Sequence, residues 1–193
     1  MARPKEFVRA DALKKALLVF WRKGFEAATL PDLTEGMGIS RSSLYETFGD
    51  KEGLYREALR LYSDEIAAKV VESLRSATTT REGLGHFLRT RVADAMKPRS
   101  PGGCLYTYAA AQGSWACQGV RATLKDRAEK TERELEALIR RGQKSREISA
   151  KKDAPALARA FELMAFGIDV MARMNPCRAR CDRAVEAALA LLD

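Results

Sequence analysis

Histidine is almost absent from this chain of 193 residues, which contains a single one, His86. A Ser-His-Asp or Cys-His catalytic arrangement would have to use that residue, and a metal site with several histidine ligands is excluded. Cysteine is also scarce, because four residues in a chain of this length are too few for a disulfide scaffold. We therefore expect no enzyme activity, no cofactor and no metal site, although Cys177 and Cys181 are spaced by one helical turn.

Long apolar runs are missing as well. No run approaches the ~20 residues that a membrane-spanning helix needs, and the charged segment from Met1 to Arg9 is not followed by the apolar stretch of a signal peptide. These absences predict a cytoplasmic protein with no membrane partner. The 34 Lys and Arg against 26 Asp and Glu leave a net charge of +8, which by itself favours an anionic partner such as nucleic acid or an acidic membrane surface.

Strand signals are nearly absent, whereas apolar residues recur at helical spacing from end to end, so we expect an all-α fold. Gly142 is expected to end the long amphipathic helix before it, and a helix that starts near Cys104 is expected to be interrupted near Gly113 or Gly119. The predicted helices cover residues 7–23, 30–37, a short segment up to 48, 51–74, a segment around 87–96, 120–141, 154–174 and 178–192.

Two short helices joined by a glycine are predicted between residues 29 and 48. Thr29 with Asp32 forms a pattern similar to a capping box, Gly38 permits a sharp turn, and Ser40 can cap the next helix. Helix, turn and helix is the arrangement in which one helix braces a second that enters the DNA major groove. The spacing alone also fits any pair of short helices around a glycine.

The residues of this segment are more specific than their spacing. From Gly38 to Lys51 they read Gly-Ile-Ser-x-x-x-Leu-Tyr-x-x-Phe-x-x-Lys, and with Gly24-Phe25 and Thr29 they resemble the DNA-binding domain of TetR/AcrR family transcriptional regulators. The resemblance covers roughly the first 60 residues; beyond them only helix number and length agree, apart from Gly103-Cys104-Leu105, which is similar to a segment in one subgroup. It implies an N-terminal three-helix helix-turn-helix domain, residues 1–50, and a C-terminal helical ligand-binding and dimerisation domain, residues 51–193.

The resemblance also implies which residues meet double-stranded operator DNA. Arginine can donate two hydrogen bonds to guanine, serine adapts to several base edges, and tyrosine can bond a phosphate. A residue at a helix N-terminus is well placed for a phosphate. The implied contacts are Thr29, Ser40, Arg41, Ser42, Ser43, Tyr45 and Lys51.

In the C-terminal part, apolar residues alternate spacings of three and four, as expected where helices pack nearly parallel or antiparallel. The resemblance implies a homodimer, and we assign these residues to its interface, although packing inside one chain would produce the same pattern. The predicted interface comprises Leu157, Phe161, Met164, Ile168, Val185 and Leu189.

A pocket for a small-molecule effector is also implied by the resemblance, and our candidates for it are Cys104, Tyr108, Trp115 and His86. Cys104 follows two glycines at a predicted helix start, with Lys97 and Arg99 shortly before it, a setting that can favour a thiolate. A free cysteine is otherwise a small buried apolar residue.

These patterns together predict a ligand-responsive transcriptional repressor that binds a palindromic operator as a homodimer and is released by a small molecule. Two alternatives stay open. The regulator could sense redox change or electrophiles through Cys104, or the chain could be a helical small-molecule carrier or enzyme whose N-terminal helices serve packing alone.

Overall fold

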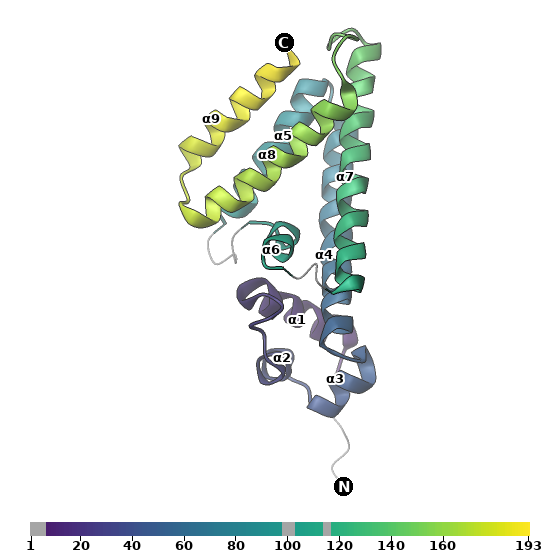
Figure 1. Ribbon diagram of the computed structural model, residues 1–193, viewed down its shortest axis with the longest axis vertical. Coiled ribbons are helices and arrows are strands. Elements are labelled where there is room, and N and C mark those ends of the chain that lie inside the picture. Colours follow the sequence, from purple (N-terminus) through teal and green to yellow (C-terminus); the bar gives the residue numbers. More distant parts are fainter. Residues whose placement is uncertain (1–6, 98–102, 114–116) are drawn as a thin grey trace.

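The computed structural model describes residues 7–97, 103–113 and 117–193, and these residues form helices and turns without a strand, which confirms the all-α prediction. Three short helices make up the N-terminal unit, and the long α4 and α7 run side by side away from it (Figure 1). None of the described helices is long and apolar enough to cross a membrane. The helices are α1 (Arg9–Lys23), α2 (Leu30–Met37), α3 (Arg41–Phe48), α4 (Lys51–Ser76), α5 (Thr80–Ala95), α6 (Leu105–Ala111), α7 (Gln118–Lys144), α8 (Ala154–Met174) and α9 (Arg178–Leu189).

Side-chain caps fix where most of these helices begin. The side chains of Thr29, Ser40 and Asp50 each accept a hydrogen bond from a backbone N–H in the first turn of α2, α3 and α4. Thr79 and Asp153 do the same for α5 and α8. Because the first N–H groups of a helix have no partner within it, each cap satisfies a donor that would otherwise need water.

Some predicted helix ends were wrong. The first helix begins at Arg9, and α7 continues through Gly142 to Lys144. Gly142 is needed for close packing, since a Cβ there would lie 2.3 Å from Oγ1 of Thr80 on α5. The last helix is α-helical to Leu189 and ends in a 3-10 turn, Ala190–Leu192.

Two hydrophobic cores lie along the chain. The first holds α1 to α3 and the first half of α4, and residues of α6 such as Leu105 join it. The second lies among the end of α4 and helices α5, α7, α8 and α9. Because α4 contributes to both cores, the division of the chain at residue 50 stays a prediction.

Helix α6 lies between the N-terminal helices and α8 (Figure 1). The Tyr106 hydroxyl donates to the Leu59 carbonyl oxygen of α4 at 3.1 Å, and the Leu105 N–H donates to the Tyr62 hydroxyl at 3.3 Å. Tyr62 also meets Trp21 of α1 edge to face, with ring centroids 4.8 Å apart. One α4 side chain therefore touches both α1 and the start of α6.

Candidate nucleic-acid interface and internal cavities

Helix α3 buries one face and exposes the other. Leu44 and Phe48 lie in the first core, whereas Arg41, Ser42 and Tyr45 are exposed. A helix held by two apolar anchors with a polar outer face can enter a DNA groove without loss of its own packing.

Arg41 and Tyr45 lie one helical turn apart and interact with each other. The Arg41 guanidinium donates to the Tyr45 hydroxyl at 3.4 Å and lies 5.6 Å from the centroid of its ring. A cation near an aromatic face is attracted to it. The two side chains therefore form a paired group on the outer face of α3.

The three serines at the start of α3 are not equivalent. The Ser40 hydroxyl accepts from the Ser43 N–H at 3.1 Å and lies 2.9 Å and 2.8 Å from the hydroxyls of Ser42 and Ser43. Ser40 is thus the N-cap of α3, and Ser43 is half-buried beside it. The exposed Ser42 is the best placed of the three to meet an outside partner.

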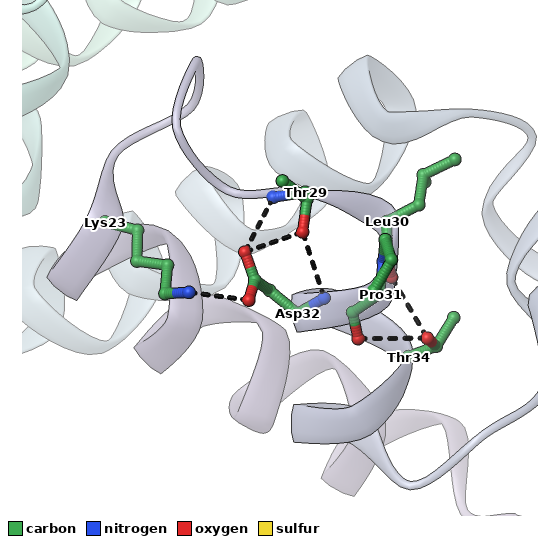
Figure 2. A network of polar contacts seen from close by, with 6 residues as sticks. All are labelled: Lys23, Thr29, Leu30, Pro31, Asp32 and Thr34. Atoms are coloured by element: carbon green, nitrogen blue, oxygen red, sulfur yellow. Dashed lines mark hydrogen bonds and ion pairs between the residues drawn. The ribbon is translucent and has the colours of Figure 1, made fainter.

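Thr29 forms a complete capping box with Asp32, as predicted (Figure 2). The Thr29 N–H donates to the Asp32 carboxylate at 2.9 Å, and the Asp32 N–H donates to the Thr29 hydroxyl at 3.3 Å. The Lys23 ammonium lies 2.5 Å from the same carboxylate and, with Thr29, holds the pKa of Asp32 well below its usual range. The cap fixes the N-terminus of α2, so that the exposed Thr29 has a defined position.

Lys51 is the first residue of α4 and reaches back to the segment after α1. Its ammonium donates to the Glu26 carbonyl oxygen at 3.2 Å and lies 4.7 Å from the centroid of the Phe25 ring. The side chain is half-buried at a helix N-terminus, where backbone N–H groups also favour an anion.

A cavity of about 350 Å³ opens among α4, α5, α6, α7 and α8. Aromatic and aliphatic side chains form much of its wall: Tyr62, Phe87, Tyr106, Leu124 and Phe166. Cys104 lines it as well, together with five charged residues: Arg91, Arg121, Lys125, Arg127 and Glu162.

A buried ion pair joins α5 to α8 beside this cavity. The Arg91 guanidinium lies 2.6 Å from the Asp169 carboxylate, and the two side chains are 11% and 4% exposed. The Thr107 hydroxyl of α6 donates to the same carboxylate oxygen at 2.9 Å. Burial raises the pKa of Asp169, and Arg91 and Thr107 oppose that rise. The ion pair and the Thr107 hydrogen bond thus link α5, α6 and α8 near Cys104.

Glu162 is a second buried acid of α8 and lines the cavity itself. Burial, together with the negative charge of Glu132, raises the pKa of Glu162 to about 7, against the opposing effect of Arg127 and Arg91. The Glu162 carboxyl therefore titrates near neutral pH.

A smaller cavity of about 240 Å³ shares Cys104 and Asp169 and also has Tyr108 in its wall. The Arg173 guanidinium lies 3.7 Å from the centroid of the Tyr108 ring. Cys104 therefore lines two cavities, and Tyr108 lines the smaller one.

The other two pocket candidates, His86 and Trp115, are not among the described residues that line these two cavities. His86 is exposed on α5 and lines neither of these two cavities, whereas the neighbouring Phe87 takes the inward position, so the assignment of His86 to a pocket stays a prediction. Trp115 lies outside the described residues. The cation beside Cys104 is Arg91, whereas Lys97 forms an ion pair with Asp94 at the surface.

Sequence reasoning missed the charged residues of these cavities, and the four that are buried or half-buried are Arg91, Arg127, Glu162 and Asp169. A signal for two of them was present: Glu162 and Asp169 are acids seven residues apart in an otherwise apolar stretch of α8. Arg91 and Arg127 carry no such signal, because arginines at those positions read as parts of solvent-facing surfaces. No group of three or more metal-binding side chains forms within the described part of the chain.

The predicted dimer residues need correction. Phe161, Ile168, Val185 and Leu189 are buried in the second core of a single chain, and Leu157 and Met164 pack partly against it. Packing inside the chain, the alternative that the sequence left open, accounts for the four buried residues, whereas Leu157 and Met164 keep exposed surface and stay predictions for the interface. The exposed apolar side chains of the same region are Leu163, Val170, Met171, Met174 and Leu191.

Two family models match the chain. The model of bacterial regulatory proteins of the tetR family matches residues 12–58, and the tetracyclin repressor-like C-terminal domain matches residues 82–188. The HTH-type transcriptional repressor ComR of Escherichia coli (strain K12) is 33% identical over 172 residues, which cover 89% of this chain and 82% of ComR. The uncharacterized regulator YezE of Bacillus subtilis (strain 168) is 34% identical over 104 residues, 54% of each chain.

Solved structures agree with these matches. A cysteine mutant of the TetR family transcriptional regulator CifR, complexed with 26bp double-strand operator DNA, is 36% identical and superimposes over the whole of both chains with a TM-score of 0.91. The reduced form of Escherichia coli NemR, at 18% identity and a TM-score of 0.79, covers 95% of each chain and shares the fold. The matched regulators are transcription factors, not enzymes, and this chain belongs to the TetR family of transcriptional regulators.

Proposed function

We propose that the chain is a transcriptional repressor that binds a palindromic operator as a homodimer and is released by a small molecule in the 350 Å³ cavity. The observation that carries this proposal is the outer face of α3, where Arg41, Ser42 and Tyr45 are exposed while Leu44 and Phe48 anchor the helix. Complexes of its relative CifR with operator DNA support the same role for this chain.

Operator binding can be tested with an inverted repeat from the DNA that flanks the coding sequence. Arg41→Ala should weaken binding of this site by about 1–3 kcal/mol while binding of unrelated DNA changes little, because a base contact discriminates between sequences. Lys51→Ala should weaken specific and nonspecific binding alike and flatten the salt dependence, because a phosphate contact carries no sequence information.

Fluorescence anisotropy against both DNAs over a salt series measures these changes. Arg133→Ala on the exposed side of α7 is the matched control, since it removes an exposed arginine outside the N-terminal unit. Unchanged operator affinity in Arg41→Ala and Lys51→Ala would refute this surface as the DNA interface.

The exposed apolar residues of α8 support a homodimer. Leu163, Val170, Met171 and Met174 recur at spacings that place them along one side of the helix, and Met174 is 75% exposed. A contiguous exposed apolar face marks an interaction surface. A second copy packed there would hold two recognition helices at the fixed separation, about 34–36 Å, that successive major-groove faces require.

The contacts between the cavity and α4 support release by a ligand. Tyr62 lines the cavity and touches Trp21 of α1, and Tyr106 lines the cavity and bonds the α4 backbone. A ligand that prefers the arrangement unable to bind DNA would lower operator affinity by a factor of about 5–150, and operator would lower ligand affinity equally. Calorimetric titration of the ligand with and without operator tests this reciprocity, and equal affinities would refute it.

A second candidate mechanism is sensing through the Cys104 thiol. Cys104 lines both cavities, and the Arg91 guanidinium and the Tyr62 hydroxyl face it. An electrophile in the cavity would bond to the sulfur as the thiol loses its proton to solvent. Loss of the response in Cys104→Ser, with the adduct found by mass spectrometry on Cys104, would favour this mechanism over reversible binding. Cys181→Ser is the control, since burial raises the pKa of the Cys181 thiol.

A further inference from the structure

Positive charge is in excess around the 350 Å³ cavity. Of the described residues that line it, Arg91, Arg121, Lys125 and Arg127 are cations and Glu162 is the acid. Asp169 compensates Arg91 through the buried ion pair. Arg121 and Lys125 are exposed to water at the edge of the cavity, which leaves the charge of Arg127 to be explained.

Arg127 lies on the inner side of α7, and its guanidinium donates to the Thr131 hydroxyl at 2.5 Å. None of the described acidic residues forms an ion pair with it. Burial lowers the pKa of Arg127, and the nearby Glu162 acts in the opposite direction. Removing a cation from water without a counter-ion is unfavourable, so this residue does not serve the stability of the fold.

Arg91 supplies a second unused donor in the same wall. One of its terminal nitrogens bonds Asp169, but its buried Nε has no hydrogen-bond partner among the described residues. A buried donor without a partner is costly and rare in native proteins, where a ligand or water often satisfies it.

We propose that the cavity binds a singly charged organic anion, a carboxylate with a small apolar body, whose oxygens accept hydrogen bonds from Arg127 and from Nε of Arg91. The inference rests on the proposed function, because it names the chemical class of the effector. Asp169 already offsets Arg91, and Glu162, whose pKa burial raises to about 7, carries only part of a negative charge near neutral pH. The Arg127 guanidinium is therefore not fully compensated, and one negative charge matches it.

The rest of the cavity fits the apolar part of such a molecule. Phe87, Leu124 and Phe166 line the cavity and can cover an aromatic ring or a short alkyl chain. The volume of about 350 Å³ lies at the lower end of small-molecule sites, about 300–1,000 Å³, which limits the body to one ring or a short chain.

Matched pairs of probes test the charge requirement. Benzoate, 4-phenylbutyrate and octanoate are titrated calorimetrically into the full-length protein, each beside its neutral primary amide of nearly equal shape. We expect at least one carboxylate to bind about ten-fold or more tightly than its amide, because charge-assisted hydrogen bonds are stronger than neutral ones. If no carboxylate exceeds its amide, or if no probe binds, the inference is overturned.

Arg127→Met removes the charge and keeps most of the apolar stem. The variant should bring carboxylate and amide to within about two-fold of each other, while the melting temperature of the protein without ligand stays level or rises. Arg133→Met, on the exposed side of the same helix, should keep the carboxylate preference. A preference that survives in Arg127→Met contradicts the assignment, and a lower melting temperature in that variant would show that Arg127 has a structural role instead.

Operator affinity with the same probes separates this inference from the proposed function. A carboxylate that binds through Arg127 but leaves operator affinity unchanged supports the ligand class and contradicts ligand-responsive release. Release of operator by the amides alone would support the proposed function and overturn the anionic class.

Discussion

The variant Glu162→Gln tests whether the Glu162 carboxyl holds a proton in the folded protein near neutral pH. Burial raises the pKa of Glu162 from the usual 4.5 to about 7 in the folded protein. Between these values the folded state holds a proton that the unfolded state has released, so stability falls as pH rises from 4.5 towards 7 and is constant above. At about 1.4 kcal/mol per unit, the full loss is about 3 kcal/mol, and water that enters the cavity reduces it to about 1–3 kcal/mol.

Glutamine is uncharged at every pH, so the variant should lack this loss. We expect Glu162→Gln to match the parent protein near pH 4.5 and to exceed its free energy of unfolding by about 1–3 kcal/mol at pH 8. Urea unfolding followed by circular dichroism at fixed protein concentration, in steps of pH, measures the difference between the two curves. Other titrating groups cancel in that difference, because the two proteins share them.

The matched control is Glu129→Gln on the exposed side of α7, where the Glu129 side chain is 47% exposed. Its unfolding free energy should stay within about 0.5 kcal/mol of the parent at every pH, because exposed ion pairs contribute little. Parallel pH curves for Glu162→Gln and the parent would refute the raised pKa and the desolvated carboxyl behind it.

Three further predictions concern stability and assembly. Asp169→Asn leaves the buried Arg91 charge uncompensated and should cost about 3–5 kcal/mol in chemical denaturation, whereas Asp126→Asn, in an ion pair of two 60% exposed side chains, should cost less than about 0.5 kcal/mol. Thr29→Ala removes the capping box of α2 and should cost about 1 kcal/mol by the same assay; no loss would mean that water replaces the cap. Leu163→Glu places a charge on the exposed apolar side of α8 and should yield folded monomers with weak operator affinity in sedimentation and anisotropy. A Leu163→Glu variant that stays dimeric would place the interface elsewhere.

Features that depend on neighbours in the sequence were predictable. The capping residues Thr29 and Ser40 act within one helical turn, so the starts of α2 and α3 were predicted correctly. Gly142 was misread because its role depends on Thr80, which is distant in sequence and meets it only in the folded chain.

The orientation of α8 is a second feature that the sequence alone could not predict. Its apolar residues cover more than one side, since Phe161 and Ile168 are buried in the chain while Leu163 and Val170 are exposed. Periodicity identifies apolar stripes but does not say which stripe faces the rest of the chain. The choice depends on where α5, α7 and α9 pack, which local patterns do not determine.

The residues of the candidate site were also predictable only in part. Arg41, Ser42 and Tyr45 belong to a contiguous motif, so sequence reasoning could select them, whereas Arg91, Arg127 and Glu162 meet only because α5, α7 and α8 converge on one cavity. Cys104 was selected from its local setting, but the predicted cations Lys97 and Arg99 gave no hint of Arg91.

The two cores differ in polarity, and this difference bears on how a signal would travel. Among the described residues, the buried acids Glu162 and Asp169 lie in α8 and the buried threonines lie in α5, α6 and α7, whereas the buried residues of α1 to α3 are aliphatic or aromatic. An apolar, closely packed unit moves as a rigid body, whereas a buried polar network has discrete arrangements whose balance a ligand can change. A ligand that satisfied Arg127 and Arg91 would therefore act first on the helices around the cavity. Tyr62 of α4, which contacts Trp21, would then pass the change to the N-terminal unit and move α3 without altering its internal packing.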